Sequence, residues 1–226
     1  MICEFSLAHY KECIELAKDK GYSIIPVKDY QEQKKVIVLR HDIDWSLEYA
    51  YELANIEYDL GINSSYFVYL HSELYNALSP KAMGMLKSIR EMGHEIGLHY
   101  NSKYDIEEED ILVASIIGTS IDSVTHHFPK SNVLKLYLYL TNPNALKLKY
   151  LSDSGRNWRE KCMCHWIGKE DKLHINIHPE WWITESESRE HAVHKMWNSA
   201  LRTLVANMTG VKDMLSDYER ELQLQK

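Results

Sequence analysis

The sequence predicts an α/β protein with a parallel sheet, and two observations carry this prediction. Short runs rich in β-branched and aromatic residues alternate with segments of helical periodicity, and five of these runs end in aspartate or histidine. The five prolines and nine glycines are spread over the 226 residues without a linker-like segment or a repeat, so we expect a single domain over 1–226.

The expected elements begin with an amphipathic helix in MICEFSLAHYKECIELAKDKGY. The expected strands are Val36–Leu39, Ser65–Leu70, His94–Leu98, Ser123–His127, Leu148–Leu151 and Leu173–Ile177. The helices expected between them are 46–60, 80–92 and 106–118, with capping signals at Ser46, Gly61, Ser79-Pro80 and Gly93. Residues 128–147 and 152–171 have weak patterns and are expected to be long loops. Helices are expected again over 186–226, with apolar positions at Val193, Trp197, Leu201, Leu204, Val211, Met214, Leu215 and Tyr218.

The composition argues against several classes of protein. A formal net charge of -7 argues against a nucleic-acid binder, which would normally present a basic face. No stretch approaches the roughly 18 apolar residues of a membrane span, and the N-terminus lacks the basic and apolar regions of a signal peptide. The four cysteines, Cys3, Cys13, Cys162 and Cys164, are expected to be free thiols in a reducing compartment, so we expect a cytoplasmic protein. The spacing Cys162-Met-Cys164 is too short to identify a zinc half-site, and nothing in the sequence indicates the oligomeric state.

Polar residues stand where five of the predicted strands end. In a parallel α/β architecture the carboxyl ends of all strands open on one face, and that face holds the site. Aspartate or histidine at five ends therefore predicts a metal or catalytic site at that rim. The strand ends are Arg40-His41-Asp42-Ile43-Asp44, Leu98-His99-Tyr100, Thr125-His126-His127, Ser152-Asp153-Ser154 and Ile177-His178-Pro179-Glu180.

The alternation of side chains along a strand sorts these residues by face. Arg40, Asp42 and Asp44 can share one face, while His41 points elsewhere. On the last strand the side chains expected to share a face are His174, Asn176 and His178.

Taken singly, most of these residues have an ordinary explanation. A lone Asp-x-Asp at a strand end is commonly a helix cap or a solvated loop. His94 and His99 would face opposite sides of one strand and are not expected to chelate together. The histidines expected to be structural are His94, His9, His71, His191 and His194. Only the joint pattern favours a functional site.

At these residues the chain resembles the polysaccharide deacetylases of the NodB-homology group, carbohydrate esterase family 4. It looks most like a subgroup with an Arg-His-Asp-x-Asp motif, of the kind found among surface-polysaccharide biosynthesis proteins. The matching stretches are LRHDID (39–44), GHEIGLHY (93–100), VTHHFPKS (124–131), KYLSDSGRNW (149–158) and INIHPEWW (175–182). GHEIGLHY is the most specific of them and VTHHFPKS the weakest. The resemblance implies a distorted, incomplete (β/α) barrel of about seven strands, similar to a TIM barrel, and removal of acetyl groups from carbohydrate with one divalent metal.

The resemblance also implies roles for individual residues. Asp42 matches the catalytic base, Asp44 the metal-binding aspartate, His99 the first metal histidine and His178 the general acid. The family pattern often has two adjacent aspartates, so the base and ligand roles could be exchanged in this Asp-x-Asp. Lys103 stands where the family has its second metal histidine. The third ligand is then expected from His127 first and His126 next, or the metal is bound poorly.

One carboxylate and two imidazoles form an open site that suits Zn²⁺ best, with Co²⁺, Mn²⁺ or Fe²⁺ as alternatives. Arg40 is expected to orient Asp42 through a charged pair. Asp153 and Arg156 are expected as partners of His178 or of the sugar. The residues expected as apolar walls beside a carbohydrate are Tyr100, Trp158 and Trp181, although Trp181-Trp182 could equally belong to the core.

The expected function is hydrolysis of an acyl group, most simply acetyl, from an amino sugar or carbohydrate precursor. Two alternatives share the barrel. The first is a catalytically inactive barrel that binds carbohydrate, which Lys103 favours because it replaces a metal ligand of the family. The second is a hydrolase of another small C–N amide bond, which would use the same site.

Overall fold

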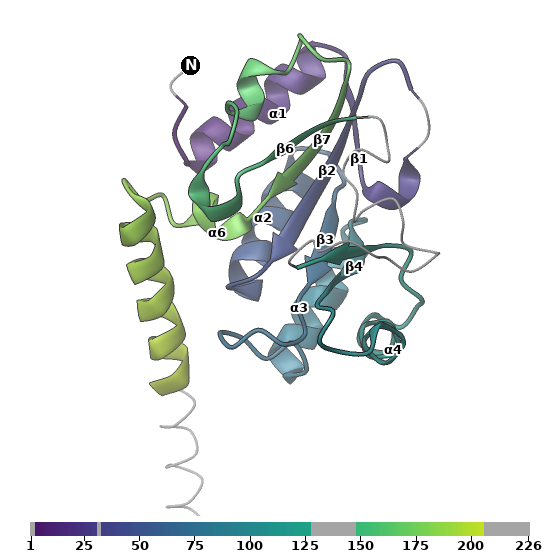
Figure 1. Ribbon diagram of the computed structural model, residues 1–226, viewed down its shortest axis with the longest axis vertical. Coiled ribbons are helices and arrows are strands. Elements are labelled where there is room, and N and C mark those ends of the chain that lie inside the picture. The colour runs from purple at the N-terminus through teal and green to yellow at the C-terminus, as the bar shows by residue number, and fades with distance from the viewer. Residues whose placement is uncertain (1–2, 31–32, 128–147, 206–226) are drawn as a thin grey trace, which may run out of the picture.

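The computed structural model describes residues 3–30, 33–127 and 148–205, and Figure 1 shows how they are arranged. Seven parallel strands form one sheet, with the order β5-β4-β3-β2-β7-β6 and with β1 paired to β2. The strands are β1 Ser23–Ile25, β2 Val36–Ile43, β3 Ser65–Val68, β4 Glu95–Tyr100, β5 Val124–His126, β6 Lys149–Ser152 and β7 Lys172–Ile177. Over the described residues β5 and β6 do not pair with each other, so the barrel is incomplete. The predicted fold class is confirmed.

Helices follow most of the strands. They are α1 Leu7–Asp19, α2 Leu47–Asp59, α3 Pro80–Glu91, α4 Ile106–Ile117 and α6 Pro179–Ile183. Short 3-10 turns are η1 Val27–Asp29, η2 Ser154–Arg156 and η3 Met163–His165. Residues 189–205 form a further helix, which stands apart from the sheet in Figure 1. The second helical piece predicted after it, and the predicted loop 128–147, lie outside the described residues.

The predicted capping residues hold the ends of the helices. The Ser46 hydroxyl accepts a hydrogen bond from the backbone N–H of Tyr49, and Ser79 caps α3 in the same way, with Pro80 at the first helical position. Such caps satisfy backbone N–H groups that have no partner inside the helix. Each cap therefore fixes where a strand-end segment stops and the helix begins.

The bounds of all six predicted strands differ from the prediction, most of them by one or two residues. β2 runs to Ile43 instead of ending at Leu39, because Arg40–Ile43 pair with Ser65–Val68 of β3. The third predicted strand begins at Glu95 and extends to Tyr100. β1 was not predicted, because three residues before Pro26 carry too little pattern to identify a strand.

The core has two sides, separated by the sheet. On the inner side, away from the helices, Val36, Val38 and Phe67 pack with Val27 and Leu148. On the outer side, the alternate residues of β2 pack against the helices in two larger clusters. The apolar inner cluster occupies the start of β2, so the inner space at the carboxyl end is left to polar side chains. No helix within the described residues is long and apolar enough to cross a membrane.

Candidate active site at the carboxyl ends of the strands

Three predicted metal ligands meet where β2, β4 and β5 end. Asp44, His99 and His127 each present a ligand atom, and these atoms lie within 4.8 Å of one another. Asp44 Oδ1 is 3.3 Å from His99 Nε2 and 3.3 Å from His127 Nδ1. The two histidine nitrogens are 2.9 Å apart. Three strand ends that are far apart in the sequence thus converge on one point, as the strand-end pattern predicted.

Alternation along β5 decides which of its two histidines takes part. Thr125 is buried on the same side as His99 and its hydroxyl lies 2.7 Å from His99 Nδ1. His127, two residues further on, faces that side as well, whereas the His126 ring packs 5.5 Å from Tyr100 on the other side. The geometry thus places His127, and not His126, beside His99 and Asp44.

The donor atoms suit a divalent metal ion. The Thr125 hydroxyl is hydrogen-bonded to Nδ1 of His99, so the other ring nitrogen, Nε2, faces His127 and Asp44. Asp44 Oδ1 is buried and makes no hydrogen bond of good geometry, although two ring nitrogens lie close to it. A carboxylate oxygen and two imidazole nitrogens at this spacing match the ligand types of an open zinc site.

Electrostatics keep the Asp44 carboxyl ionised. Burial alone would raise its pKa, but the His127 and His99 ring nitrogens hold the pKa well below its usual range. Lys103, at the position of the family's second metal histidine, is exposed and only its backbone N–H bonds nearby, to Asn101 Oδ1. His127, and not Lys103, places a side-chain nitrogen beside Asp44 and His99.

Asp42 lies one layer deeper on the same face of β2. Its Oδ2 accepts hydrogen bonds from Arg40 at 3.1 Å and from Asn176 at 2.9 Å, and the Thr125 hydroxyl is 3.5 Å from Oδ1. Burial alone would raise the pKa of Asp42, but Arg40 and the nearby His99 lower it. Asp42 is thus a carboxylate held in place on one oxygen, with the other turned toward the His99 side.

His178 follows β7 and is held by Asp153. Its Nδ1 lies 2.6 Å from Asp153 Oδ1 and its backbone N–H donates to the same oxygen at 3.0 Å. Trp182 Nε1 donates to the other Asp153 oxygen at 2.7 Å. Burial would lower the pKa of His178, but Asp153 raises it well above its usual range. His178 Nε2 lies 3.9 Å from Asp44 Oδ2, so a histidine inclined to carry a proton faces the three ligands.

Two residues that were predicted to contact the sugar, Tyr100 and Arg156, do not face the three metal-ligand candidates. Tyr100 follows His99 by one position, so it faces the outer cluster, and its hydroxyl donates to the backbone oxygen of Tyr104. Arg156 donates to the backbone oxygen of Ser186 and lies over the Phe5 ring. Two of the residues expected beside the sugar are therefore placed in packing and loop contacts instead.

The two tryptophans predicted as walls, Trp158 and Trp181, lie in different places. Trp158 stacks on Phe5 with ring centroids 6.5 Å apart, away from the strand ends. Trp181 is buried with its ring 6.4 Å from Trp45, the residue after Asp44, and its Nε1 has no hydrogen-bond partner. Of the wall residues, Trp181 lies on the α6 side next to the site and stays a prediction.

Several site residues were not predicted. Tyr69, just after β3, stacks on the His127 ring with centroids 4.4 Å apart. Glu180 is buried, its Oε1 has no hydrogen-bond partner, and burial raises its pKa to about 8. Thr125 and Asn176, which hold His99 and Asp42, belong to the same group. These residues could have been found from their positions at or just beyond a strand end, because that position identifies uncharged residues as well as charged ones.

Comparisons with known proteins bear on the fold. No family model matches the sequence, and no curated protein gives a significant match. A deacetylase from Streptococcus pyogenes, solved in complex with acetate, is 12% identical with a TM-score of 0.48, over 83% of this chain and 85% of that one. A family 4 carbohydrate esterase from Bacillus anthracis is 14% identical with a TM-score of 0.43, over 84% of each chain.

A third solved structure comes from Bordetella bronchiseptica and is described as a polysaccharide deacetylase involved in O-antigen biosynthesis. It is 16% identical with a TM-score of 0.43, over 72% of this chain and 80% of that one. At such identities the likeness is one of fold, and the roles of single residues rest on the geometry of this chain.

Proposed function

We propose that this protein is a metal-dependent hydrolase that removes an acetyl group from an amino sugar or carbohydrate precursor. One observation supports the proposal most strongly. Asp44, His99 and His127 converge within 4.8 Å, and a held carboxylate and a held histidine flank them. A ligand group, a base and an acid around one point are the parts that amide hydrolysis by activated water needs.

The metal and the base have separate tasks. Asp44, His99 and His127 would hold a divalent ion, which supplies a Lewis acid that polarises the acyl carbonyl and activates water. Asp42 would accept the proton of the attacking water on Oδ1, the oxygen that Arg40 and Asn176 leave free. Because Arg40 keeps Asp42 ionised and oriented, the base is ready at neutral pH.

His178 would supply the proton to the departing amine. Asp153 holds its Nδ1, so the proton available for transfer sits on Nε2, which faces Asp44. The buried Asp153 carboxylate also favours the charged imidazolium, as the direction of the His178 pKa indicates. This division assigns Asp42 as base and His178 as acid, and it leaves Asp153 as a positioning residue.

The substrate class follows from the resemblance and is a proposal throughout. A carbohydrate would approach the strand ends beside Trp45, which is half-buried and packs on the buried Trp181, and beside Tyr69, which stacks on His127. The second candidate is a barrel that binds carbohydrate without cleaving it. Lys103 favours that reading, because it removes the ligand that the family places four residues after His99.

The test combines metal content with acetate release. Purified protein is reconstituted with Zn²⁺, Co²⁺, Mn²⁺ or Fe²⁺ and incubated with N-acetylated amino sugars and their oligomers, and free acetate is measured. His127→Ala is expected to lose one metal equivalent per chain and the activity with it. His126→Ala is the matched control, since the neighbouring ring faces the other side, and it should keep both.

The outcomes separate the candidates. Metal that depends on His127 together with acetate release supports the deacetylase. Metal and sugar binding without acetate release would leave the carbohydrate-binding barrel. Release of another acid from small amides but not from acetylated sugars would assign the site to a different C–N bond.

A further inference from the structure

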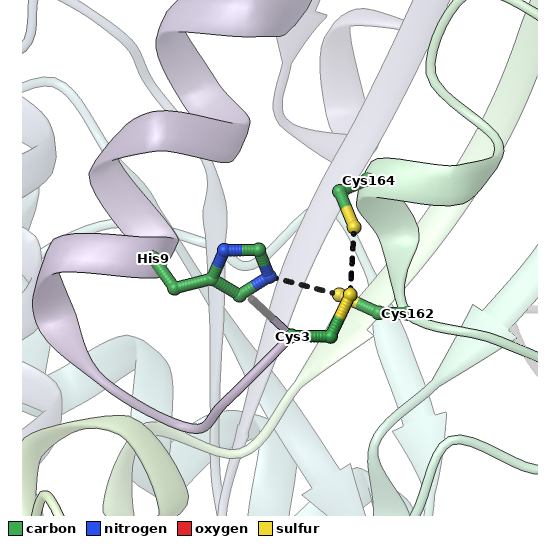
Figure 2. A group of neighbouring side chains, drawn as sticks. All are labelled: Cys3, His9, Cys162 and Cys164. Carbon is green, nitrogen blue, oxygen red and sulfur yellow. Dashed lines mark hydrogen bonds between the residues drawn. The ribbon is translucent and has the colours of Figure 1, made fainter. Parts of the chain in front are cut away.

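All four cysteines of the chain come together in one place outside the strand-end site. Cys3 precedes α1, Cys13 lies on α1, and Cys162 and Cys164 flank the start of η3, more than 150 residues away in the sequence from Cys3. In the described residues none of them forms a disulfide. Figure 2 shows the sulfur atoms of Cys3, Cys162 and Cys164 grouped on one side of the His9 ring.

The ligand atoms have the spacing of a four-coordinate site. We call this group the cysteine–histidine cluster, and its ligand atoms all lie within 4.8 Å of one another. His9 Nε2 is 3.2 Å from Cys162 Sγ, and Cys3 Sγ is 3.3 Å from Cys164 Sγ. Bonds of about 2.3 Å to sulfur and 2.0–2.1 Å to nitrogen put the sulfur and nitrogen ligands of a tetrahedral site roughly 3.5–3.8 Å apart, slightly further than these two pairs are without an ion. The members of the cluster are Cys3, His9, Cys162 and Cys164.

His9 is built to act as a ligand. Its side chain is 3% exposed, although an imidazole buried among apolar groups is costly without partners. Nε2 points at the sulfurs, and Nδ1 lies 3.5 Å from the Glu12 carboxylate one turn further along α1. A carboxylate behind the far nitrogen of a histidine is the usual arrangement in metal sites. His165, by contrast, is exposed and lies 3.4 Å from Cys164 and 3.7 Å from Cys3 outside the cluster.

We propose that the cysteine–histidine cluster binds one structural zinc ion. Three thiols and one imidazole form a soft donor set that selects zinc over the hard cations, and each thiol releases its proton on binding. Four protein ligands fill the tetrahedral positions and leave none for water or substrate, so the site has no catalytic role of its own.

The position of the cluster gives it a structural task. It joins the N-terminal segment and α1 to the loop between β6 and β7, two parts of the chain that also meet through apolar packing and through Arg156 over the Phe5 ring. The His9 ring stacks 6.2 Å from Trp182, and Trp182 holds Asp153. A bound ion would therefore also fix the support behind the site at the strand ends.

The experiment measures zinc in an Asp44→Asn background, so that a metal ion at the strand ends does not enter the count. The full chain is purified in reducing buffer without chelator and analysed by elemental mass spectrometry. We expect close to one zinc per chain, and loss of that zinc in Cys3→Ser. Cys3 is exposed, so this variant should fold, which circular dichroism checks.

Two control variants define the ligand set. Cys13 lies 3.6 Å from His9 Nε2 but outside the cluster, so Cys13→Ala should keep the zinc, as should His165→Ala. Zinc loss in either control would overturn this assignment of ligands. Cobalt substitution adds a readout independent of activity, because thiolate ligands give an intense near-ultraviolet charge-transfer absorption that carboxylate and imidazole do not give.

The proposal fails if the Asp44→Asn protein holds no zinc after reconstitution, or if its cobalt form lacks the sulfur absorption. A Cys3–Cys164 disulfide in protein isolated without oxygen would also overturn it. None of these results bears on acetate release, so the structural site and the deacetylase can fail separately. Where the zinc is present, a chelator should lower the Tm of Asp44→Asn and leave the Tm of its Cys3→Ser derivative unchanged.

Discussion

On the inner face of β2, Arg40 and Asp42 lie among polar atoms that lack hydrogen bonds. Arg40 Nε, Asn176 Oδ1 and both ring nitrogens of His174 are buried without a partner. On the outer face, His41 meets Glu57 of α2, and every oxygen of that carboxylate is bonded. The donors to Glu57 are Tyr10, His41, Ser64 and Tyr66.

Both faces are buried, and they differ in how many of their polar atoms have hydrogen-bond partners. Among these outer side chains only His41 Nδ1 lacks a partner, so the outer network is satisfied by the fold itself. The inner face keeps buried donors and acceptors without partners, which is the state expected of a site that is completed by a ligand. The adjacent residues His41 and Asp42 thus belong to a network that is satisfied and to one that is not, respectively.

The largest expected effect is on the inner side, at Asp44. Asp44→Asn should lower kcat/KM for acetate release by at least about 10³-fold, because a bound ion supplies several kcal/mol of transition-state stabilisation. Its side chain is 21% exposed, so the unfolding free energy of the metal-free protein should change by less than about 1 kcal/mol. Acetate release and denaturation in chelator measure the two quantities. Parallel losses of both would mean that the inner face is structural.

The outer face should show the opposite pattern at Glu57. Glu57→Gln leaves His41 and three hydroxyl groups around an amide, and breaking a buried charged network costs about 3–5 kcal/mol of unfolding free energy. Activity per folded molecule should stay unchanged. Glu52→Gln on the exposed side of α2 is the matched control and should cost less than about 0.5 kcal/mol. A Glu57 variant that folds normally but loses activity would remove the distinction between the faces.

A smaller loss is expected at Asp153, which acts through His178. Asp153→Asn keeps the size of the side chain but removes the charge that raises the His178 pKa. We expect kcat to fall by about 10²-fold, the low end of the range for acid–base catalysis. The alkaline limb of the pH–rate profile should also move to lower pH, because His178 then loses its proton earlier. An unchanged profile would mean that His178 is not the acid.

The alternation of side chains made much of the inner face predictable from sequence. It separated Arg40, Asp42 and Asp44 from His41, and the strand-end pattern identified His99 and His178 as members of one rim. The same rule, applied to Tyr100 next to His99, would have placed that side chain on the outer side. The α/β class with a parallel sheet followed from the alternation of strands and helices, which depends only on local pattern, whereas the incomplete barrel was implied by the resemblance.

What the sequence did not reveal depends on contacts between distant segments. Arg156 and Trp158 lie in a loop without periodicity, so their distance from the strand ends could not be foreseen. The cysteine–histidine cluster joins residues near the N-terminus to residues beyond 160, and spacing alone carries no trace of it. Tyr69 and Thr125 are neither aspartate nor histidine, so the strand-end pattern did not include them, although both occupy strand-end positions that face the ligands.

The smallest expected effect is a difference between the two faces in how the unfolding free energy depends on pH. Burial, and then the charge of Arg40, lower the pKa of His174 to about 3. Burial alone would raise the pKa of Glu57, but His41 lowers it to about 2. The unfolded chain therefore takes up a proton at His174 below pH ~6.5 and at Glu57 below pH ~4.5, while the folded chain does not. The protein therefore loses stability as the pH falls from ~6.5 to about 3 because of His174, and from ~4.5 to about 2 because of Glu57.

Differences between variants isolate each group from the other titrating residues. The unfolding free energy of the protein minus that of His174→Leu should fall by about 1.4 kcal/mol for each pH unit between 6.5 and 4.5. The corresponding difference for Glu57→Gln should be flat over that range and fall only below pH ~4.5. Urea denaturation at half-unit intervals measures both curves. Coincident windows would show that the inner and outer networks titrate as one, and that β2 does not separate them.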